Sequence, residues 1–439
     1  MSNSFREISF WLMDALKGKH IKNHYNDINF ILENYNTEAS KTARENRLLN
    51  LLNHACKTTP FYKDVSNFKS IKDFPVINKN IIRNNYNDFK SEDYIHKKNT
   101  PVVTSGSTGT PFKLFHNKNK RLRNTADVIY FAKQAGYQLG TKLYYMKVWN
   151  DINRKSKFQM WKENIVPYSI HNYTDDDFKM FISKIKADRN DKNLVGFAST
   201  FELLCKYMDK TKAEPLKSNN IKSIIANSEA LTSYAKNTME HYFECPTLSR
   251  YSNMENGMLA QQSRTGGEEF HINWASFYIE ILNLDNDEPA KYGEYGRVVI
   301  TDLFNYCMPI IRYDNGDIAM MSENPKGKEL APVISQINGR KVDTIFDTNN
   351  NTITSHIVTV NMWKYDELKQ YQFIQVGEKD YIFKLNPIAK FTKENEILSE
   401  FKGYLGKDAN ITIEYVDDIP LLSSGKRKLV VNDYSFSNP

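Results

Sequence analysis

Residues 100–116 read TPVVTSGSTGTPFKLFH, in which a run of hydroxyl side chains and glycines lies between two strand-like flanks. Val102 and Val103 precede the run, and Phe112 to His116 follow it with the alternation of a half-buried strand, so we expect a strand, a loop and a second strand. The loop itself, TSGSTGTP at 104–111, admits two interpretations. Small polar residues with Gly and Pro are typical of a solvated linker. The same residues also gather N–H and O–H donors that could hold an anion.

One class of nucleotide-binding loop is disfavoured by this stretch. A P-loop runs from a strand through GxxxxGK[ST] into a helix. Residues 104–111 lack the Gly-Lys-Ser/Thr ending, and Pro111 stands where that helix would begin. If the loop binds phosphate, it does so in a different fold.

Length and charge limit the class of protein. With 439 residues, 40% of them hydrophobic, the chain is long enough for two or more domains with a sizeable core. The net charge of +7 comes from 59 basic and 52 acidic residues and is spread along the chain. Because clustered Lys/Arg runs are missing, we expect no nucleic-acid partner. A mild basic surplus suits an enzyme for anionic substrates.

Cysteine spacing and hydropathy suggest a cytoplasmic protein. Cys56, Cys205, Cys245 and Cys307 are far apart and form no CxxC pair, which argues against a disulfide framework or a zinc site. No apolar run approaches the length of a transmembrane helix, and no signal peptide is recognisable. Residues 5–16 place Phe5, Ile8, Leu12 and Ala15 on one helical face, which indicates a core or docking surface. A weak association of this helix with a membrane surface is the alternative.

The order of elements predicts an α/β protein. The first 98 residues have mainly helical patterns, including ARENRLLNLLNHACKTTPFY, which should stop at Pro60. Short apolar strands then alternate with helices, and from Phe270 onward strands dominate, among them MPIIRYDNGDIAMM at 308–321. The last hundred residues hold strands around a charged helix at about 392–404, which is a small α+β unit. We see no internal repeat.

Several polar clusters follow the predicted strands. Taken singly, each is an ordinary turn, cap or tail; they are SEA at 228–230, YSNMENG at 251–257, RYDNGD at 312–317, NGRKVD at 338–343 and SSGKRK at 423–428.

Together and in this order, the clusters resemble the adenylate-forming superfamily of acyl- and aryl-CoA synthetases. Within it the chain is similar to the phenylacetate–coenzyme A ligase branch, which includes relatives in capsular polysaccharide biosynthesis. The resemblance covers about residues 45–430 and includes PFY at 60–62, FPVINK at 74–79 and YGEYGRVVITDLFNYCMPIIRYDNGDIA at 292–319. It implies a large N-terminal α/β domain, residues 1–338, and a small mobile α+β C-terminal domain, residues 339–439.

The resemblance also implies a chemistry. The carboxylate of an acid attacks the α-phosphate of ATP, pyrophosphate leaves, and the acyl-adenylate is passed to coenzyme A. Charge builds on the phosphoryl oxygens, so the site needs donors and cations. The phosphate loop would be Thr104, Ser105, Gly106, Ser107, Thr108 and Gly109.

Other roles follow the same motifs. Glu255 would bind Mg²⁺, and Tyr251 would lie against the adenine. Asp317 would accept the ribose hydroxyl protons, and Arg340 would donate to the sugar or its phosphate. For the acid itself we expect Phe197, Ser199 and Glu229.

Lys426 in SSGKRK is the predicted catalytic cation, with Lys428 as its competitor. The pivot of the small domain would lie near Val342 and Asp343.

Departures from the family pattern keep alternatives open. The usual Tyr-Gly is Tyr251-Ser252, and the usual Thr is Met254. FDTNNNTITSHIV at 346–358 lacks the glycine and proline that the ligase branch carries where coenzyme A is held. A second acceptor, such as an amino sugar in cell-surface polysaccharide synthesis, therefore stays open. So does a non-catalytic nucleotide-binding relative. The identity of the acid and the oligomeric state are not encoded in these motifs.

Overall fold

The computed structural model describes residues 3–104, 112–147, 155–169, 174–216, 220–227, 231–265, 267–327, 330–340, 345–350, 352–353, 358, 361–362, 365, 367–387, 389–420 and 428–434. The chain divides into two compact units, one of Met1–Asn315 with Ala319–Ile337, the other of Gly316–Ile318 with Asn338–Pro439. The predicted functional domains, 1–338 and 339–439, stay a prediction.

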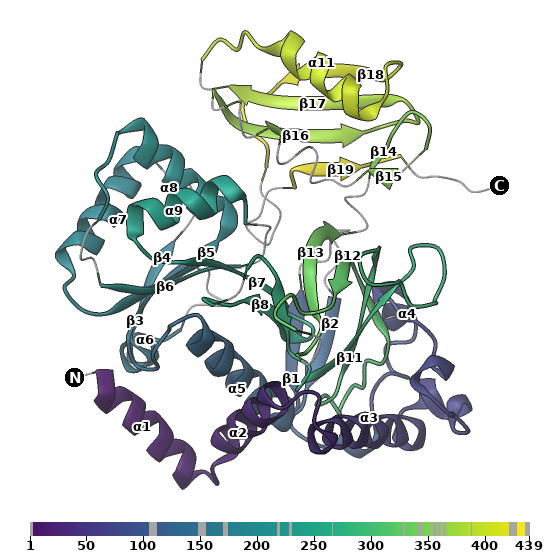
Figure 1. Ribbon diagram of the computed structural model, residues 1–439. Helices are drawn as coiled ribbons and strands as arrows, with labels where there is room; N and C mark the ends of the chain where they lie inside the picture. Colours follow the sequence, from purple (N-terminus) through teal and green to yellow (C-terminus); the bar gives the residue numbers. More distant parts are fainter. Residues whose placement is uncertain are drawn as a thin grey trace. The chain divides into compact units, whose positions relative to one another are not determined.

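Helices form most of the chain before the first strand (Figure 1). The longest of them, α3, begins after the Thr37 cap, whose side chain accepts the N–H of Ser40, and it ends before Pro60 as predicted. The elements of this part are α1 Asn3–Leu16, α2 His20–Glu33, α3 Glu38–Thr58, η1 Pro60–Val65, η2 Ile71–Asp73, α4 Lys79–Asn84 and η3 Glu92–Tyr94.

Helix α1 has one packed face and one exposed apolar face. The Trp11 ring meets the Tyr25 ring of α2 edge-on, with the ring centres 6.0 Å apart. Beside Trp11, on the predicted apolar stripe, Phe5, Ile8 and Leu12 are 49%, 62% and 59% exposed. The predicted stripe is therefore a surface in this structure, and its association with a membrane surface stays a prediction. No helix within the described ranges is both long and apolar enough to cross a bilayer.

Strands β1 and β2 flank the hydroxyl-rich loop as an antiparallel pair, in which Thr100 lies opposite His116 and Thr104 opposite Phe112. Their bounds are Thr100–Thr104 and Phe112–His116. The predicted strand–loop–strand arrangement is confirmed for the flanks, whereas residues 105–111 lie outside the described residues.

The large unit is built on one sheet, in which the described strands run in the order β10-β11-β12-β13-β9-β8-β7-β6-β5-β3-β4. Its first part is parallel: β3, β4, β5, β6 and β7 pair side by side in one direction. The strand bounds are β3 Lys142–Lys147, β4 Ile165–Ser169, β5 Lys192–Phe197, β6 Ile221–Asn227 and β7 Thr247–Asn253. The helices between and before them are α5 Lys118–Gln134, α6 Lys157–Glu163, α7 Asp175–Ala187, α8 Ala198–Lys210 and α9 Ser233–Phe243.

The two faces of this parallel part are covered by different helices (Figure 1). Leu194, Ile224 and Ala226 pack beneath α7, α8 and α9. On the opposite face, Val195, Ile225 and Leu248 pack with Ala135, which follows α5 directly. Because side chains alternate along a strand, these two sets show which face each neighbouring residue meets.

The second part of the sheet is antiparallel where β7 to β9 and β10 to β11 pair. The strands are β8 Gly257–Gln262, β9 Phe270–Ile272, β10 Phe277–Leu282, β11 Tyr295–Asp302, β12 Tyr313–Ser322 and β13 Val333–Arg340. All four cysteines are buried and free.

One predicted strand begins later than its pattern indicates. Residues 308–312 of MPIIRYDNGDIAMM lie outside β12, which begins at Tyr313. Pro309 has no N–H for a ladder, and Arg312 has a φ of 52°, a conformation that ends an extended segment. Apolar character alone does not reveal either constraint.

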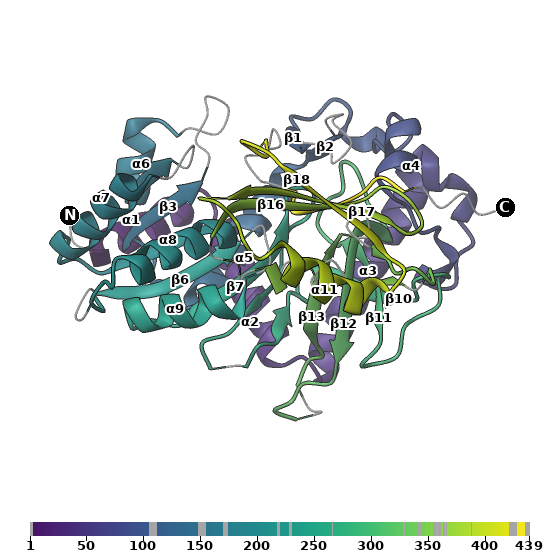
Figure 2. The same cartoon turned by 90° about the horizontal axis from the view of Figure 1, so that it is seen from above.

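The small unit is an α+β layer structure (Figure 2). Its main sheet runs β18-β17-β16-β19. Ile397, Phe401 and Leu405 of α11 join the same core as Phe373 and Phe383 of the sheet. The bounds are β16 Leu368–Gln375, β17 Asp380–Pro387, α11 Glu394–Leu405, β18 Asn410–Tyr415 and β19 Val430–Asn432, with a separate pair of β14 Ile345–Phe346 and β15 Thr352–Ile353.

Candidate functional site

Glu255 lies in the short turn between β7 and β8 and is only 4% exposed. The turn is held by Asn253, whose Oδ1 accepts the N–H of Asn256 at 2.7 Å. Gly257 ends the turn with a φ of +104°, a backbone conformation that residues other than glycine rarely adopt. The sequence therefore fixes this carboxylate by local turn chemistry.

Three segments that are distant in the sequence converge on Glu255. Nε2 of His116, at the end of β2, donates to its carbonyl oxygen at 2.8 Å. The Tyr313 hydroxyl of β12 lies 3.5 Å from Oε1. Nζ of Lys79 lies 2.7 Å from the same Oε1. Glu255 thus joins the flank of the hydroxyl-rich loop to β12 and to α4.

Lys79 follows a segment that two backbone hydrogen bonds hold against Arg312 and Asp314. Ile77 accepts the N–H of Asp314 at 2.8 Å and donates its own N–H to Arg312 at 3.0 Å. Asn78 then caps α4 by accepting the N–H groups of Asn80 and Ile81. Sequence reasoning included this lysine in the FPVINK motif without giving it a role, although a lysine inside a family motif was the available signal.

The YSNME and RYDNGD motifs also meet. Nδ2 of Asn315 donates to the Tyr251 hydroxyl at 2.6 Å, so β7 and β12 place these motifs side by side. Asp317 is half-buried and lies two residues further along β12. The predicted nucleotide residues Tyr251 and Glu255 are thereby brought to one region.

The remaining predicted residues are described in part or not at all. Phe197 ends β5, is half-buried and immediately precedes α8. Thr104, Ser199 and Arg340 belong to β1, α8 and β13, but their side chains lie outside the description. The other predicted positions, which are Ser105, Gly106, Ser107, Thr108, Gly109, Glu229, Val342, Asp343 and Lys426, lie outside the described residues.

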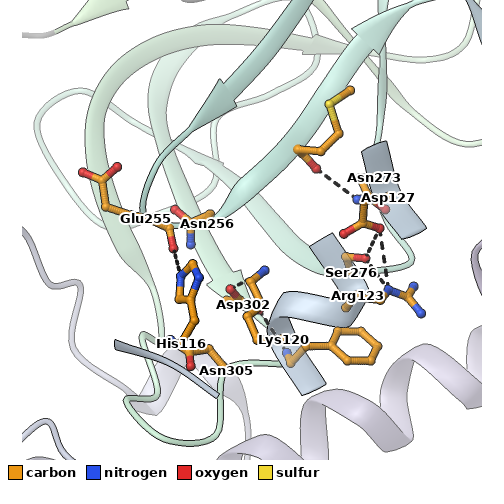
Figure 3. A network of polar contacts seen from close by, with 12 residues as sticks. His116, Lys120, Arg123, Asp127, Glu255, Asn256, Asn273, Ser276, Asp302 and Asn305 are labelled. Atoms are coloured by element: carbon orange, nitrogen blue, oxygen red, sulfur yellow. Dashed lines mark hydrogen bonds and ion pairs between the residues drawn. The ribbon is translucent and has the colours of Figure 1, made fainter. Parts of the chain in front are cut away.

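A buried polar network lies beside Glu255 and His116 (Figure 3). Nζ of Lys120, in the first turn of α5, is 2.6 Å from Oδ2 of Asp302 at the end of β11, and both side chains are almost fully buried. The same ammonium lies 4.5 Å from the centre of the Phe277 ring. The contact is an ion pair whose angles do not suit a hydrogen bond.

A second part of the network begins one turn along α5. Nε of Arg123 donates to the Ser276 hydroxyl at 2.7 Å, and that hydroxyl donates to Oδ1 of Asp127 at 2.6 Å (Figure 3). Burial raises the pKa of Asp127, and the Arg123 guanidinium opposes the rise. This network anchors α5 to the strands on which the candidate site is built.

His116 should make the stability of this region depend on pH. Burial, and then the Lys120 ammonium, lower the pKa of His116 below 6.5. As the pH falls through about 6.5, the unfolded chain takes up a proton that the folded chain does not. We therefore expect the free energy of unfolding to fall on acidification, by up to about 1.4 kcal/mol per pH unit from this group. Denaturant titrations between about pH 7 and pH 5 measure the slope.

The control is His116→Gln, which keeps a donor for the Glu255 carbonyl but does not titrate. Its slope should be smaller yet not zero, because the pKa values of His24 and His271 are also lowered, first by burial. An identical slope in both proteins would contradict the assignment.

A magnesium ion fits this site only in part. In the part of the chain that the structure describes, no three His, Cys, Asp or Glu side chains converge as a metal site. One carboxylate, that of Glu255, is available, and its Oε1 is next to Lys79. Mg²⁺ is commonly held by one or two carboxylates together with substrate phosphates and water. The donor set is therefore suited to a metal that arrives with a nucleotide.

The chain is similar in sequence to a known family and to a known protein. Residues 345–433 match the family described as the CapK C-terminal domain. Protein CapK of Staphylococcus aureus is 23% identical over 96% of this chain and 96% of its own length.

Two solved structures show the fold. A 2-hydroxyisobutyryl-CoA ligase in the postadenylation state, in complex with 2-HIB-AMP, has a TM-score of 0.68 and 16% identity over 90% of each chain. ATP-bound MatB from Rhodopseudomonas palustris has a TM-score of 0.55 and 13% identity over 75% of this chain and 66% of that chain. The chain thus has the mixed α/β fold of these two acyl-CoA ligase structures, and its C-terminal region matches the CapK C-terminal domain.

Proposed function

We propose that this protein activates a carboxylic acid with ATP, forming an acyl-adenylate and releasing pyrophosphate. The observation that carries the proposal is the convergence on Glu255 of His116 from the flank of the hydroxyl-rich loop, Lys79 and Tyr313. A buried carboxylate that contacts a lysine and a strand flanking a donor-rich sequence is an arrangement that can hold a phosphate chain and its metal. The relationship to CapK over nearly the full length supports it.

The roles proposed for the nucleotide are as follows. Thr104 to Gly109 donate to the β- and γ-phosphates. Lys79 exchanges its contact with Glu255 for a phosphate oxygen when the nucleotide binds. Tyr251, which Asn315 holds in place by a hydrogen bond to its hydroxyl, lies against the adenine. Asp317 and Arg340 bind the ribose.

Mg²⁺ would be held by Glu255 and the phosphates, where it would neutralise charge on the phosphoryl oxygens. Lys426 of the C-terminal domain would place its ammonium between the acid and the α-phosphate. The reacting oxygens carry like charges, so a cation between them lowers the barrier.

For the second step we propose transfer to coenzyme A, as in the phenylacetate–coenzyme A ligases. The alternative acceptor is a non-coenzyme nucleophile, such as an amino sugar in capsular or cell-surface polysaccharide biosynthesis. Residues 346–358, which lack the glycine and proline expected where coenzyme A is held, favour this alternative. A nucleotide-binding relative without turnover is the third possibility.

A panel of carboxylic acids, assayed for pyrophosphate release with and without coenzyme A, tests these readings. The proposal expects release that needs both ATP and an acid. Thioester formation supports coenzyme A as acceptor, whereas release without thioester supports the alternative. ATP binding without release from any acid would contradict activation and leave the non-catalytic relative.

A further inference from the structure

A row of side chains crosses the carboxyl ends of β5, β6, β7 and the neighbouring β8. Phe197 is aligned with Asn227, Asn227 with Arg250, and Arg250 with Gln261. Aligned residues of neighbouring strands point to the same face of a sheet. Two residues earlier on three of these strands, Val195, Ile225 and Leu248 pack on the α5 side, so the row faces that side as well.

Arg250 is the unusual member of the row. Its Nε donates to Oε1 of Gln261 at 2.9 Å, and Nε2 of Gln261 donates in turn to the Phe131 carbonyl at 2.7 Å. Its Nη2 is buried and has no hydrogen-bond partner. Burial lowers the pKa of this guanidinium to about 10. The charge is therefore held in a costly position and only partly satisfied.

Three arginines of this protein are more deeply buried than Arg250, and each of them is neutralised by a carboxylate. Arg123 pairs with Asp27 and Asp127. Arg297 pairs with Asp287 and Asp314, and Arg312 with Glu280. Among the described residues, no carboxylate forms an ion pair with Arg250. A purely structural arginine would be expected to resemble the other three.

The neighbours of Arg250 are also polar. Asn227 hydrogen-bonds Tyr145, and the Asn227 amide group carries N–H donors. Tyr145, Asn227 and Arg250 are each half-buried, so none of the three belongs to the fully buried core. A guanidinium, an amide and a phenol together match a carboxylate.

The position of the row agrees with a substrate site. Ligands of open α/β sheets bind outside the carboxyl ends of parallel strands. Tyr251 follows Arg250 directly and points to the opposite face, because side chains alternate along a strand. The adenine contact proposed for Tyr251 and a contact of Arg250 with the acid are therefore compatible.

We propose that Arg250, assisted by Asn227 and Tyr145, binds a second carboxylate of the acid, so that the substrate is a dicarboxylic acid. The inference rests on the proposed activation of an acid and names the class of that acid. One carboxylate would be adenylated, and the other would complete the guanidinium fork.

The test compares acids of equal chain length by ATP–pyrophosphate exchange. Malonate, succinate and glutarate are set against propionate, butyrate and valerate. The wild-type protein should prefer the diacids, and Arg250→Met should lower kcat/KM for the best diacid about 100-fold, because it removes a charge-assisted contact. Arg250→Lys should retain part of the preference, since it keeps the charge without the fork. Arg189→Met, at an exposed arginine, should change nothing.

A binding measurement separates this inference from the proposed function. Succinate should raise the Tm of the wild-type protein and not that of Arg250→Met. The Tm of the variant alone should stay level or rise, because an unpaired buried cation is removed. Exchange with monocarboxylates as fast as with diacids would overturn the inference while activation stands. A Tm shift that needs Arg250, without exchange from any acid, would support the inference and refute activation. If neither exchange nor a Tm shift were observed, both the inference and the proposed activation would be overturned.

Discussion

Replacing Lys426 by alanine should lower acid-dependent pyrophosphate release about 100-fold or more. The proposed ammonium interacts with charge that develops in the transition state, and the loss of one such contact costs about 2–4 kcal/mol. Because the contact forms mainly in the transition state, kcat should fall more than the KM for ATP rises. Single-turnover pyrophosphate release under saturating ATP and acid measures the change.

Lys428→Ala is the matched control, since it removes the same functional group two positions away. The Lys428 carbonyl accepts a hydrogen bond from Nε2 of Gln372 at 2.7 Å, and the Leu429 carbonyl accepts the N–H of Phe373 at 2.8 Å. These bonds fix the Lys428 backbone beside β16, so its replacement should leave the rate near that of the wild-type protein. Loss of activity in Lys428→Ala alone would make Lys428 the catalytic cation. Equal activity in both variants would refute a lysine from this segment.

The parts of the fold that sequence reasoning anticipated depend on local patterns. Helix α3 shows a helical apolar period and ends before Pro60, and β1 and β2 show strand alternation on both sides of a glycine-rich run. Periodicity and turn residues act over a few positions, so one sequence is enough to read them. Residues 308–312 were misread, because the backbone conformation of Arg312 depends on its partner segments.

The residues of the candidate site also differ in whether a local sequence motif contains them. Tyr251, Glu255 and Asp317 can be proposed from the sequence because they belong to ordered motifs. Lys79 and His116 were missed because their contacts with Glu255 join positions far apart in the chain. Only the folded structure reveals which charges face one another across such separations.

Arg250 was missed for a related reason. It precedes the Tyr251 motif and has no pattern of its own in the sequence. Its unpaired Nη2 becomes visible only when the partners of the other buried arginines are known. The absence of a counter-ion near a buried charge can be recognised only in the folded structure, because no short stretch of sequence shows which charges lie nearby.

Lys120 is buried although the charged residues around it in the sequence suggest an exposed helix face. It stands in NKNKRLRN at 117–124, a run whose charges suggest a solvated helix face. In the structure Lys120 and Arg123, three residues apart, both turn into the protein and are fully buried. Residues three apart share one face of a helix, so helix α5 directs two of its cations inward together. Their partners, Asp302 for Lys120 and Asp27 with Asp127 for Arg123, decide the outcome.

Removing the charge of Asp302 should therefore destabilise the large unit severely. In Asp302→Asn the Lys120 ammonium stays buried without its counter-charge, and breaking a buried pair from one side costs about 3–5 kcal/mol. In the wild-type protein Oδ1 of Asp302 accepts the Phe304 N–H at 3.0 Å, and asparagine retains an oxygen for this bond. The loss of stability therefore measures the removal of the charge and not the loss of this hydrogen bond. Urea unfolding, followed by tryptophan fluorescence, measures the free energy.

The double variant Lys120→Met/Asp302→Asn decides whether the pair is the cause. It should be clearly more stable than Asp302→Asn, because the buried charge leaves together with its partner. Lys63→Met breaks an exposed pair with Glu92, in which the side chains are 52% and 53% exposed, and it should cost at most about 1 kcal/mol. If Asp302→Asn cost no more than Lys63→Met, the buried pair would not hold α5 against β11. The network would then not anchor α5 to the strands on which the candidate site is built.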